Sequence, residues 1–211
     1  DRLITRLISA ETGLKSDLLR TGRLAEHEWQ QLNNKITGLE SAPLFIDDTP
    51  ALSVFELRAK CRRLKQQHNV QMIVIDYLQL MSSGGKGGNR EQEISSISRS
   101  IKEIAKELEV PIIALSQLSR SVETRGGDKR PLLSDLRDSG AIEQDADVIL
   151  FIYRKYVYSR DEEDKGLGEI IVAKHRNGPT GLVDISFISQ YAKFENLSRV
   201  QTEFIPDDIP A

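Results

Sequence analysis

Residues 72–76, Met-Ile-Val-Ile-Asp, decide the fold class of this chain. Four consecutive apolar residues that end at a carboxylate are typical of a strand covered by other elements on both faces. A second run, Ile-Ile-Ala-Leu at 112–115, is followed by Ser116 and Gln117. Between the two runs apolar residues recur at helical spacing, at Ile94, Ile97, Ile101, Ile104 and Leu108. This strand–helix–strand pattern predicts an α/β fold with a mostly parallel, twisted sheet flanked by helices.

The patterns on either side of this unit continue the alternation. Residues 1–11 and 24–39 have helical apolar spacing, and Ser53 with Glu56 forms a capping box that predicts a helix to about His68. Further along, residues 148–153, 169–175 and 182–188 predict strands, and the turn signal at 177–181 makes the last two a C-terminal β-hairpin. We expect one domain over residues 1–200 and a disordered tail at 201–211.

The composition excludes several classes of protein. Lys and Arg number 29 against 32 Asp and Glu, a net charge of −3, so the chain is no generic polyanion binder. Any nucleic-acid contact must come from a few local side chains. The single cysteine, Cys61, excludes an internal disulfide and predicts a reducing compartment such as the cytoplasm. No apolar run approaches the ~20 residues of a membrane span, so no membrane partner is expected.

Two polar side chains follow the two apolar strands. In parallel sheets ligands bind beyond the carboxyl ends of the strands, which is where Asp76 and Gln117 stand. A carboxylate there can hold Mg²⁺ through water beside bound phosphates, and an amide can orient a water at a phosphoryl group. Singly, Asp76 is explained as well by a turn and Gln117 better by a loop hydrogen bond. Together they favour a phosphate site.

Two cations flank His175 near the predicted hairpin turn. Residues two apart on a strand share a face, so Lys174 and Arg176 are expected to point the same way. An ammonium and a planar guanidinium aimed together suit phosphate recognition. A solvated hairpin rim explains the pair equally well. Residues 118–138 predict a basic loop region, and the three histidines are too scattered for a metal site.

Several longer strings resemble the DnaB family of bacterial replicative DNA helicases. They are RAKCRRLK at 58–65, MIVIDYLQLM at 72–81, IIALSQLSR at 112–120, RDSGAIEQDAD at 137–147 and AKHRNGP at 173–179. They follow in family order and cover nearly the whole chain. The resemblance implies the RecA-like ATPase domain of a homohexameric ring. Such a ring binds ATP and Mg²⁺ and translocates along single-stranded DNA, with a helicase loader and primase as further partners.

The resemblance also implies roles for individual residues. Asp76 matches the Walker B aspartate that holds Mg²⁺, and Gln117 matches the glutamine that couples the γ-phosphate to the DNA-binding loops. Arg176 matches the arginine finger that reaches ATP on the adjacent subunit, with Lys174 as its neighbouring lysine. Residues Arg137, Asp138 and Gly140 fall in the loop that contacts the DNA backbone. Asp138 stands where a glutamate is common, which favours a main-chain contact there.

The chain departs from the family in one large respect. It contains no G-x-x-x-x-G-K-[ST] loop to cradle phosphates, since the glycines around Lys86 have the wrong spacing. The family's catalytic glutamate and its amino-terminal, primase-binding domain are expected before Asp1. We therefore expect an N-terminally truncated motor domain that is inactive alone. It would carry the residues that act on a neighbour's ATP and only part of its own ATP site.

Two other functions stay open at this point. The chain could be a non-catalytic module that binds DNA, a loader or sister subunits, which the missing phosphate loop favours. It could instead belong to a related RecA-like ATPase of recombination or signalling. The strings at 137–147 and 174–179 argue against that second alternative.

Overall fold

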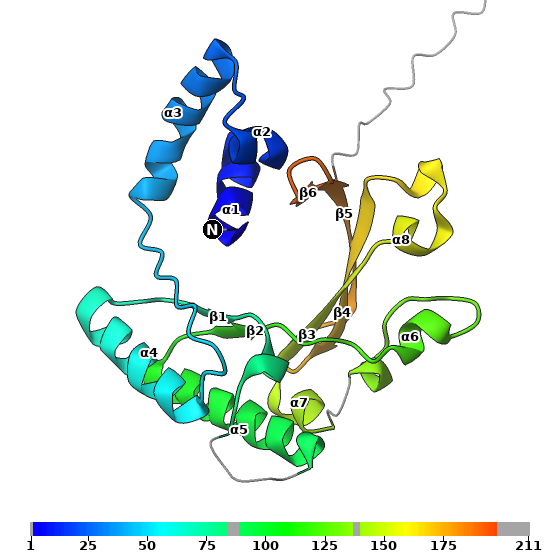
Figure 1. The fold of residues 1–211 in the computed structure, drawn as a ribbon. Helices are drawn as coiled ribbons and strands as arrows, with labels where there is room; N and C mark the ends of the chain where they lie inside the picture. The colour runs from blue at the N-terminus through cyan, green and yellow to red at the C-terminus, as the bar shows by residue number, and fades with distance from the viewer. Residues whose placement is uncertain (1, 84–88, 137–139, 198–211) are drawn as a thin grey trace, which may run out of the picture.

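The computed structural model describes residues 2–83, 89–136 and 140–197. Helices and strands alternate along most of the chain, and the strands form two separate sheets (Figure 1). The helices are α1 (Arg2–Thr12), α2 (Ser16–Thr21), α3 (Glu26–Glu40), α4 (Val54–His68), α5 (Arg90–Leu108), α6 (Ser121–Thr124), α7 (Gly140–Asp145) and α8 (Tyr156–Ser159). The 3-10 helices are η1 (Leu78–Leu80), η2 (Leu133–Asp135) and η3 (Glu162–Asp164). The strands are β1 (Ile73–Ile75), β2 (Ile112–Ala114), β3 (Val148–Tyr153), β4 (Leu167–His175), β5 (Gly181–Ile188) and β6 (Lys193–Asn196).

The strand–helix–strand unit predicted from residues 72–115 is confirmed. Strands β1 and β2 pair in parallel, with Ile75 opposite Ala114, and α5 forms the crossover between them. Two neighbouring parallel strands need such a crossover because the chain must return to the end of the sheet at which the first strand begins. Helix α5 is capped at its start by Asn89, whose side chain accepts the N–H of Glu91 at 3.3 Å, and at its end by Glu109, which adopts a left-handed conformation.

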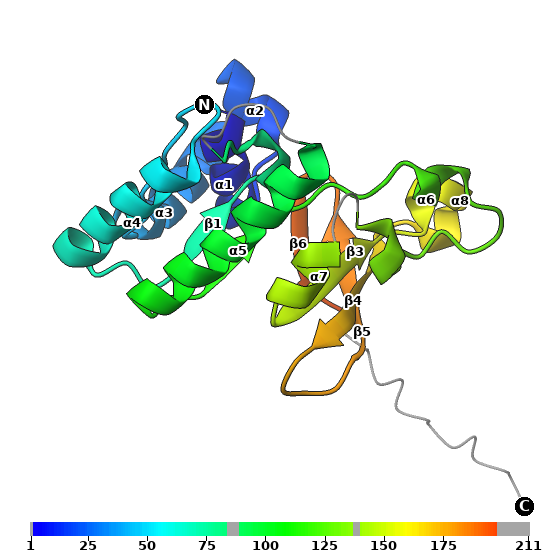
Figure 2. The same cartoon turned by 90° about the horizontal axis from the view of Figure 1, so that it is seen from below.

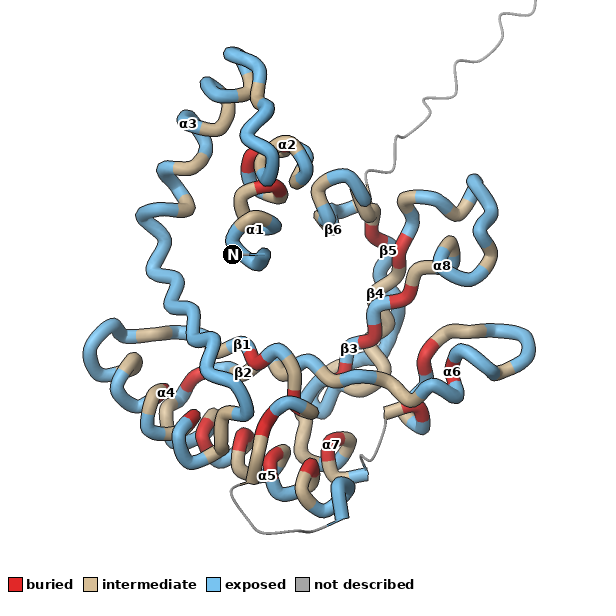
Figure 3. Tube along the Cα trace, in the orientation of Figure 1, coloured by how far each residue is buried: buried red, intermediate tan, exposed pale blue. Residues whose placement is uncertain are grey.

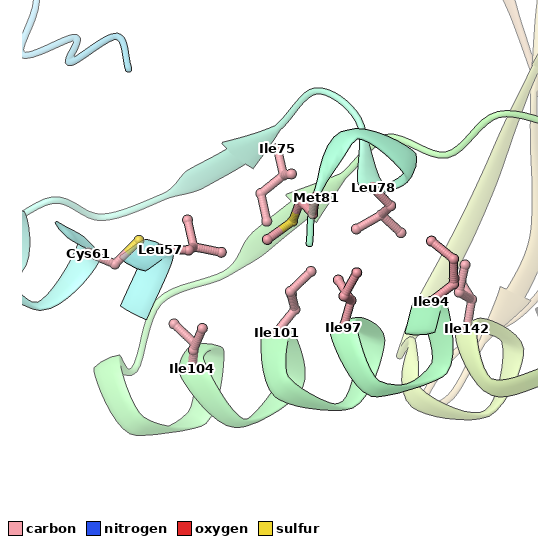
Figure 4. Close-up of a cluster of buried hydrophobic side chains, with 10 residues drawn as sticks. All are labelled: Leu57, Cys61, Ile75, Leu78, Met81, Ile94, Ile97, Ile101, Ile104 and Ile142. Atoms are coloured by element: carbon pink, nitrogen blue, oxygen red, sulfur yellow. The ribbon is translucent and has the colours of Figure 1, made fainter. Parts of the chain in front are cut away.

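The hydrophobic core lies between α5, α4 and the parallel pair. Ile97 and Ile104 are fully buried, and Ile94 is nearly so. Ile104 points from α5 toward Leu57 of α4, and Ile97 points toward Met81 (Figure 4). Ile94 lies beside Leu78 and Ile142. The complete cluster of buried residues is Leu57, Cys61, Ile75, Leu78, Met81, Ile94, Ile97, Ile101, Ile104 and Ile142. Burial raises the pKa of the Cys61 thiol to about 11, so this cysteine is a core residue and not a reactive one.

The three amino-terminal helices form a group of their own. Helix α1 packs against both α2 and α3. The junction is polar but satisfied: the hydroxyl of Ser9 donates to the Leu14 carbonyl, and the Gln31 amide donates to the Thr12 carbonyl, both at 2.6 Å. Helix α4 follows after residues 41–53, and its predicted capping box between Ser53 and Glu56 is confirmed. Within the described residues, no helix is both long and apolar enough to cross a membrane.

The second sheet is antiparallel, in the order β3–β4–β5–β6. The predicted hairpin is confirmed as β4–β5, where Val172 lies opposite Gly181. Strand β6 was not predicted from the sequence. It pairs with β5 through Phe187 and Phe194, whose ring centroids lie 4.7 Å apart. Figure 2 shows α7 between this sheet and α5, and α4 side by side with α5.

Two details of the expected sheet are corrected by the structure. Among the described strands only β1 and β2 pair in parallel, so the sheets are not mostly parallel. Within the described residues β3 is covered on one face only, because Ile149 and Phe151 are buried, whereas Leu150 and Ile152 are more than half exposed. Figure 3 shows this alternation of buried and exposed residues along β3. Val74 on β1 is likewise 56% exposed. The apolar runs do mark the strands, but hydrophobicity does not reveal which chain segment lies against each face.

Candidate functional site

Asp76 and Gln117 lie at the same edge of the parallel pair, where β1 and β2 end. The N–H of Leu115 donates to the carbonyl of Ile75 at 2.9 Å, which continues the pairing beyond Ala114. Both residues are exposed, and within the described ranges neither side chain has a hydrogen-bond or ion-pair partner. The fold thus brings to one edge the two side chains that the sequence analysis paired.

Lys174 and Arg176 lie at the end of β4, against α7. The ammonium group of Lys174 donates to the main-chain carbonyls of Glu143 and Ala146, the latter at 2.8 Å. Arg176 donates from Nη2 to the carbonyl of Gln144 at 2.9 Å. Cations stabilise the carboxyl end of a helix because they satisfy its unpaired carbonyls. The two side chains do act on one side of the hairpin, and in this chain they bind their own α7.

Asp147, which precedes β3, contacts both the main chain and the guanidinium of Arg176. The main-chain N–H of Arg176 donates to the carbonyl of Asp147 at 2.8 Å, and Nη1 lies 3.3 Å from the Asp147 carboxylate. Lys102 of α5 binds the same carboxylate. The Lys102 ammonium holds the pKa of Asp147 below its usual range, with a smaller contribution from Arg176 and against partial burial. In the turn that follows, a Cβ at Gly178 would lie 2.3 Å from the exposed His175 ring, so a larger residue there would displace that ring.

The basic region before α7 is less available to a ligand than its composition indicates. Arg125 binds the buried carboxylate of Asp135, and Arg130 makes two hydrogen bonds to Glu169 on β4, at 2.6 and 2.7 Å. Glu169 raises the pKa of Arg130, which keeps this guanidinium charged and paired. Arg125 therefore ties residues 118–136 together internally, and Arg130 fastens this segment to β4.

The three predicted DNA contacts are only partly placed. Gly140 is exposed and is the first residue of α7. Arg137 and Asp138 lie outside the described residues, as do residues 84–88 and the tail at 201–211. Within the described ranges, no hydrogen bond or ion pair joins Asp76 or Gln117 to Lys174 or Arg176. By the elements that carry them, the described candidate residues form two groups, one after β1 and β2 and one at α7.

Comparison with known proteins shows the family of this chain. The family model of the DnaB-like helicase C-terminal domain matches residues 1–196. The chain belongs to this family. It is 54% identical over 199 residues to the replicative DNA helicase DnaB of Geobacillus stearothermophilus and 52% identical over 200 residues to the replicative DNA helicase DnaC of Bacillus subtilis. Each alignment covers 94% of this chain and 44% of the relative, so the chain spans less than half the length of these curated relatives.

Solved structures support the same assignment. A DnaB-like replicative helicase, described with its interactions with primase, superimposes with a TM-score of 0.87 at 42% identity. The alignment covers 92% of this chain and 47% of that one. A second solved structure, of an isolated ATPase domain, gives the same score and identity, and 70% of its chain is covered. The expected α/β, RecA-like fold class is therefore confirmed for this DnaB-like chain, with an antiparallel hairpin sheet beside the parallel pair.

The chemistry of the β1–β2 edge fits a magnesium ion that is held mostly by other ligands. Within the described part of the chain, no cluster of three or more His, Cys, Asp or Glu side chains could enclose a metal. Mg²⁺ does not need such a cage, because it usually keeps several waters and binds one or two carboxylates together with substrate phosphates. The free carboxylate of Asp76 can supply one such contact.

The residues that position these groups were not predicted. Asp147 and Lys102 hold Arg176, and Gln79 contacts the segment of Gln117. Gln79 and Asp147 stand inside the strings that resemble the family, which marks the segments but not the contacts. Their roles depend on partners 29 or more residues away in the chain, so no local pattern could have shown them.

Proposed function

We propose that this DnaB-like chain is part of the ATPase motor of a replicative DNA helicase. Such a motor hydrolyses ATP and moves along single-stranded DNA as a hexameric ring, and so unwinds duplex DNA at the replication fork. The observation that carries the proposal is the separation of the candidate residues into two groups. An ATP site shared between subunits needs this separation, because one group holds the nucleotide of its own subunit and the other reaches the neighbour's nucleotide.

The group after β1 and β2 would act on the nucleotide of its own subunit. Asp76 would hold Mg²⁺ through water, and the ion neutralises charge on the β- and γ-phosphates when it is bound. Gln117 would contact the γ-phosphate or the attacking water, since its side chain has no competing partner within the described ranges. Both roles use side chains that the fold leaves exposed at one edge.

The group at α7 would act on the neighbour's nucleotide. The guanidinium of Arg176 would stabilise the charge that develops on the transferred phosphoryl group, with Lys174 beside it. In this chain Lys174 binds the main-chain carbonyl of Ala146. Arg176 binds the carbonyl of Gln144 and the carboxylate of Asp147. Contact with phosphate across an interface would exchange these bonds for phosphate oxygens. The support for the proposal is that both cations lie on one side of the hairpin.

The DNA contact would lie at the start of α7. Arg137, Asp138 and Gly140 would bind the backbone of single-stranded DNA, Arg137 through its charge and the other two through main-chain groups. With a net charge of −3, binding depends on few cations, so it should be independent of sequence and should weaken as salt rises. Because α7 begins at Gly140 and Lys174 binds the carbonyl of Ala146 directly after it, the proposed DNA and nucleotide contacts would lie at opposite ends of this short helix.

The partners follow from the same proposal. Sister subunits would form the homohexamer, and a helicase loader and primase would bind the complete protein in the cytoplasm, where the bacterial chromosome is copied. A solved DnaB-like helicase was determined with its interactions with primase, which supports that partner for the family. ATP and Mg²⁺ are the cofactors of the proposed reaction.

One observation favours a second function for the 211 residues taken alone. They contain no G-x-x-x-x-G-K-[ST] loop, so the chain by itself would act as a non-catalytic module that binds DNA or sister subunits.

A chimera tests the motor proposal. The corresponding segment of the Geobacillus stearothermophilus helicase, 54% identical, is replaced by this chain. We expect DNA-stimulated ATP hydrolysis and strand separation, and the loss of both on Asp76→Asn. Exposed Asp17, which binds only Arg20 on the surface, serves as the matched control in an Asp17→Asn variant. A folded, hexameric chimera that neither hydrolyses ATP nor unwinds DNA would refute the proposal.

A further inference from the structure

We infer that Gln79 is a positioning residue that holds the main chain of Gln117 in place beside Asp76. The side-chain amide of Gln79 makes two hydrogen bonds to the segment after β2. Its Nε2 donates to the hydroxyl of Ser116 at 3.0 Å, and its Oε1 accepts the main-chain N–H of Gln117 at 3.3 Å. The functional part of this inference rests on the role proposed above for Gln117.

These two bonds complete a continuous connection between the β1 and β2 segments. Leu115 N–H donates to the carbonyl of Ile75 at 2.9 Å, and the next bond runs from Leu78 N–H to the carbonyl of Leu115 at 2.9 Å. Beyond Leu115 no further main-chain bond is made between the two segments within the described residues. The side chain of Gln79 takes over at that point. The segment that carries Asp76 and the segment that carries Gln117 are therefore tied together up to Gln117 itself.

The main chain of Gln79 is held in turn by α5. Arg90, in the first turn of α5, donates to the carbonyl of Gln79 at 2.6 Å and also binds Glu93. The main-chain N–H of Ser83 and the Arg90 guanidinium hold the pKa of Glu93 below its usual range, so this partner of Arg90 stays ionised. Buried Leu78 anchors the same turn in the core. The main chain of Gln79 is thus held by Arg90 and by the neighbouring Leu78, while its side-chain amide contacts Gln117.

An amide of this length makes both contacts as the structure has them, with the Ser116 hydroxyl as acceptor and the Gln117 N–H as donor. It offers a donor and an acceptor from one planar group, whereas a carboxylate offers acceptors only and a leucine neither. The arrangement fixes the main chain of Gln117 and leaves its side chain free to meet a ligand. A residue that must meet a phosphoryl group within a fraction of an ångström needs such support, because a small displacement costs much of the rate.

The first test uses the 211-residue chain and does not depend on any activity. Amide hydrogen exchange is measured by NMR for the chain and for Gln79→Leu, Gln79→Ala and Gln79→Glu. We expect the Gln117 amide to exchange about tenfold faster in the Leu and Ala variants, since one hydrogen bond is lost. The Leu78 and Leu115 amides should stay as protected as before. Gln79→Glu keeps an acceptor and should keep Gln117 protected.

A matched control separates this effect from a general loosening. Gln71→Ala removes an amide that bonds only to Asn69, just before β1, and should leave the Gln117 amide unchanged. Unchanged exchange at Gln117 in Gln79→Leu would overturn the inference. Equal acceleration of Leu78, Leu115 and Gln117 would overturn it as well, because it would mean general destabilisation.

The second test uses the chimera with the Geobacillus stearothermophilus helicase. Gln79→Leu should lower DNA-stimulated kcat about tenfold while KM for ATP stays within about twofold. Normal stimulation by DNA in this variant would overturn the functional part of the inference. If the unmodified chimera hydrolyses no ATP, the proposed function fails, and the exchange experiment still decides whether Gln79 positions Gln117.

Discussion

The ammonium group of Lys174 donates a 2.8 Å hydrogen bond to the main-chain carbonyl of Ala146, directly after the helix that begins at Gly140. Glu143 in the same helix offers a second carbonyl, and Arg176 binds a third, that of Gln144. One six-residue helix therefore has the proposed DNA contact at its start and both proposed trans-acting cations at its end. Because α7 has only six residues, we expect a change in the contacts at one end to alter the contacts at the other.

Arg176→Ala should abolish most ATP hydrolysis in the chimeric hexamer while ATP binding and the fold persist. A guanidinium that stabilises transition-state charge on a phosphoryl group is worth on the order of 10³-fold or more in other NTPases. Steady-state hydrolysis and nucleotide binding are measured in parallel. Exposed Arg63, on α4, provides an arginine control as Arg63→Ala.

Subunit mixing shows whether Arg176 acts across an interface. The Arg176→Ala subunit is combined with a subunit altered in its phosphate-binding loop, so that each mixed interface can contain one intact pair of half-sites. Some hydrolysis should return. If mixed hexamers form and stay inactive, or if Arg176→Ala alone hydrolyses ATP normally, the trans role is wrong.

The 211-residue chain alone should not hydrolyse ATP. Without the main-chain N–H groups and lysine of a phosphate loop, Mg²⁺ at Asp76 has few phosphate contacts to complete its coordination. Phosphate release is measured with the chain and with its Asp76→Asn variant. Robust turnover that Asp76→Asn removes would contradict this expectation, because it would show that the chain contains a complete site.

Arg137→Ala should weaken the binding of single-stranded DNA by the chimera about equally for oligonucleotides of different sequence. A contact to phosphate carries no base information, and its loss should reduce the slope of log K against log salt by about 1. Fluorescence anisotropy at several salt concentrations measures both quantities. A marked change in sequence preference would point to base recognition instead.

Asp135→Asn should destabilise the chain at neutral pH. Burial alone would raise the pKa of Asp135, but the Arg125 guanidinium and the Leu132 N–H outweigh it and lower the pKa below the ordinary value. A carboxyl with a lowered folded pKa stabilises the fold above its unfolded pKa of about 3.9 and loses this contribution as pH falls through the folded pKa. The loss at pH 7 should be about 2 kcal/mol, since Arg125 stays partly solvated.

Urea unfolding followed by circular dichroism checks both the size and the pH dependence. The difference between the original chain and Asp135→Asn should shrink as pH falls below about 4. Asp128→Asn, at an exposed carboxylate that binds Arg130, should leave the free energy of unfolding nearly unchanged. A difference at Asp135 that is independent of pH would mean that the ion pair is not its cause.

Ile97→Ala and Ile113→Ala compare one residue type in two environments. Ile97 is fully buried on α5, so its truncation should cost about 3–4 kcal/mol through lost burial and a cavity. Ile113 is 49% exposed on β2, and its truncation should cost about 1 kcal/mol or less. Both variants are measured by urea unfolding. Equal losses of unfolding free energy in Ile97→Ala and Ile113→Ala would contradict the described core.

Local patterns in the sequence were enough to predict the main elements. The stepping of Ile94, Ile97 and Ile101 predicted α5, because a helix buries one stripe and the spacing of that stripe is set by its own geometry. The apolar runs before Asp76 and Gln117 predicted β1 and β2, and the turn at Gly178 predicted the hairpin. Asp76 and Gln117 were candidates because the carboxyl ends of neighbouring parallel strands lie at one edge, a rule that needs no coordinates.

The partners of these residues were decided by tertiary structure alone. The bond from Gln79 to Gln117 joins residues 38 positions apart, and Lys174 reaches Ala146 across 28. The apolar character of β3 is the same on both faces, yet Ile149, Phe151 and Tyr153 are buried and the alternate residues are exposed, because other chain segments lie on one side. Hydrophobic periodicity reflects only residues that are close together in the sequence, so it does not identify the distant segments that pack on each face. The bonds that position Gln117 and hold Arg176 arise only when distant segments pack, so they appear first in the folded molecule.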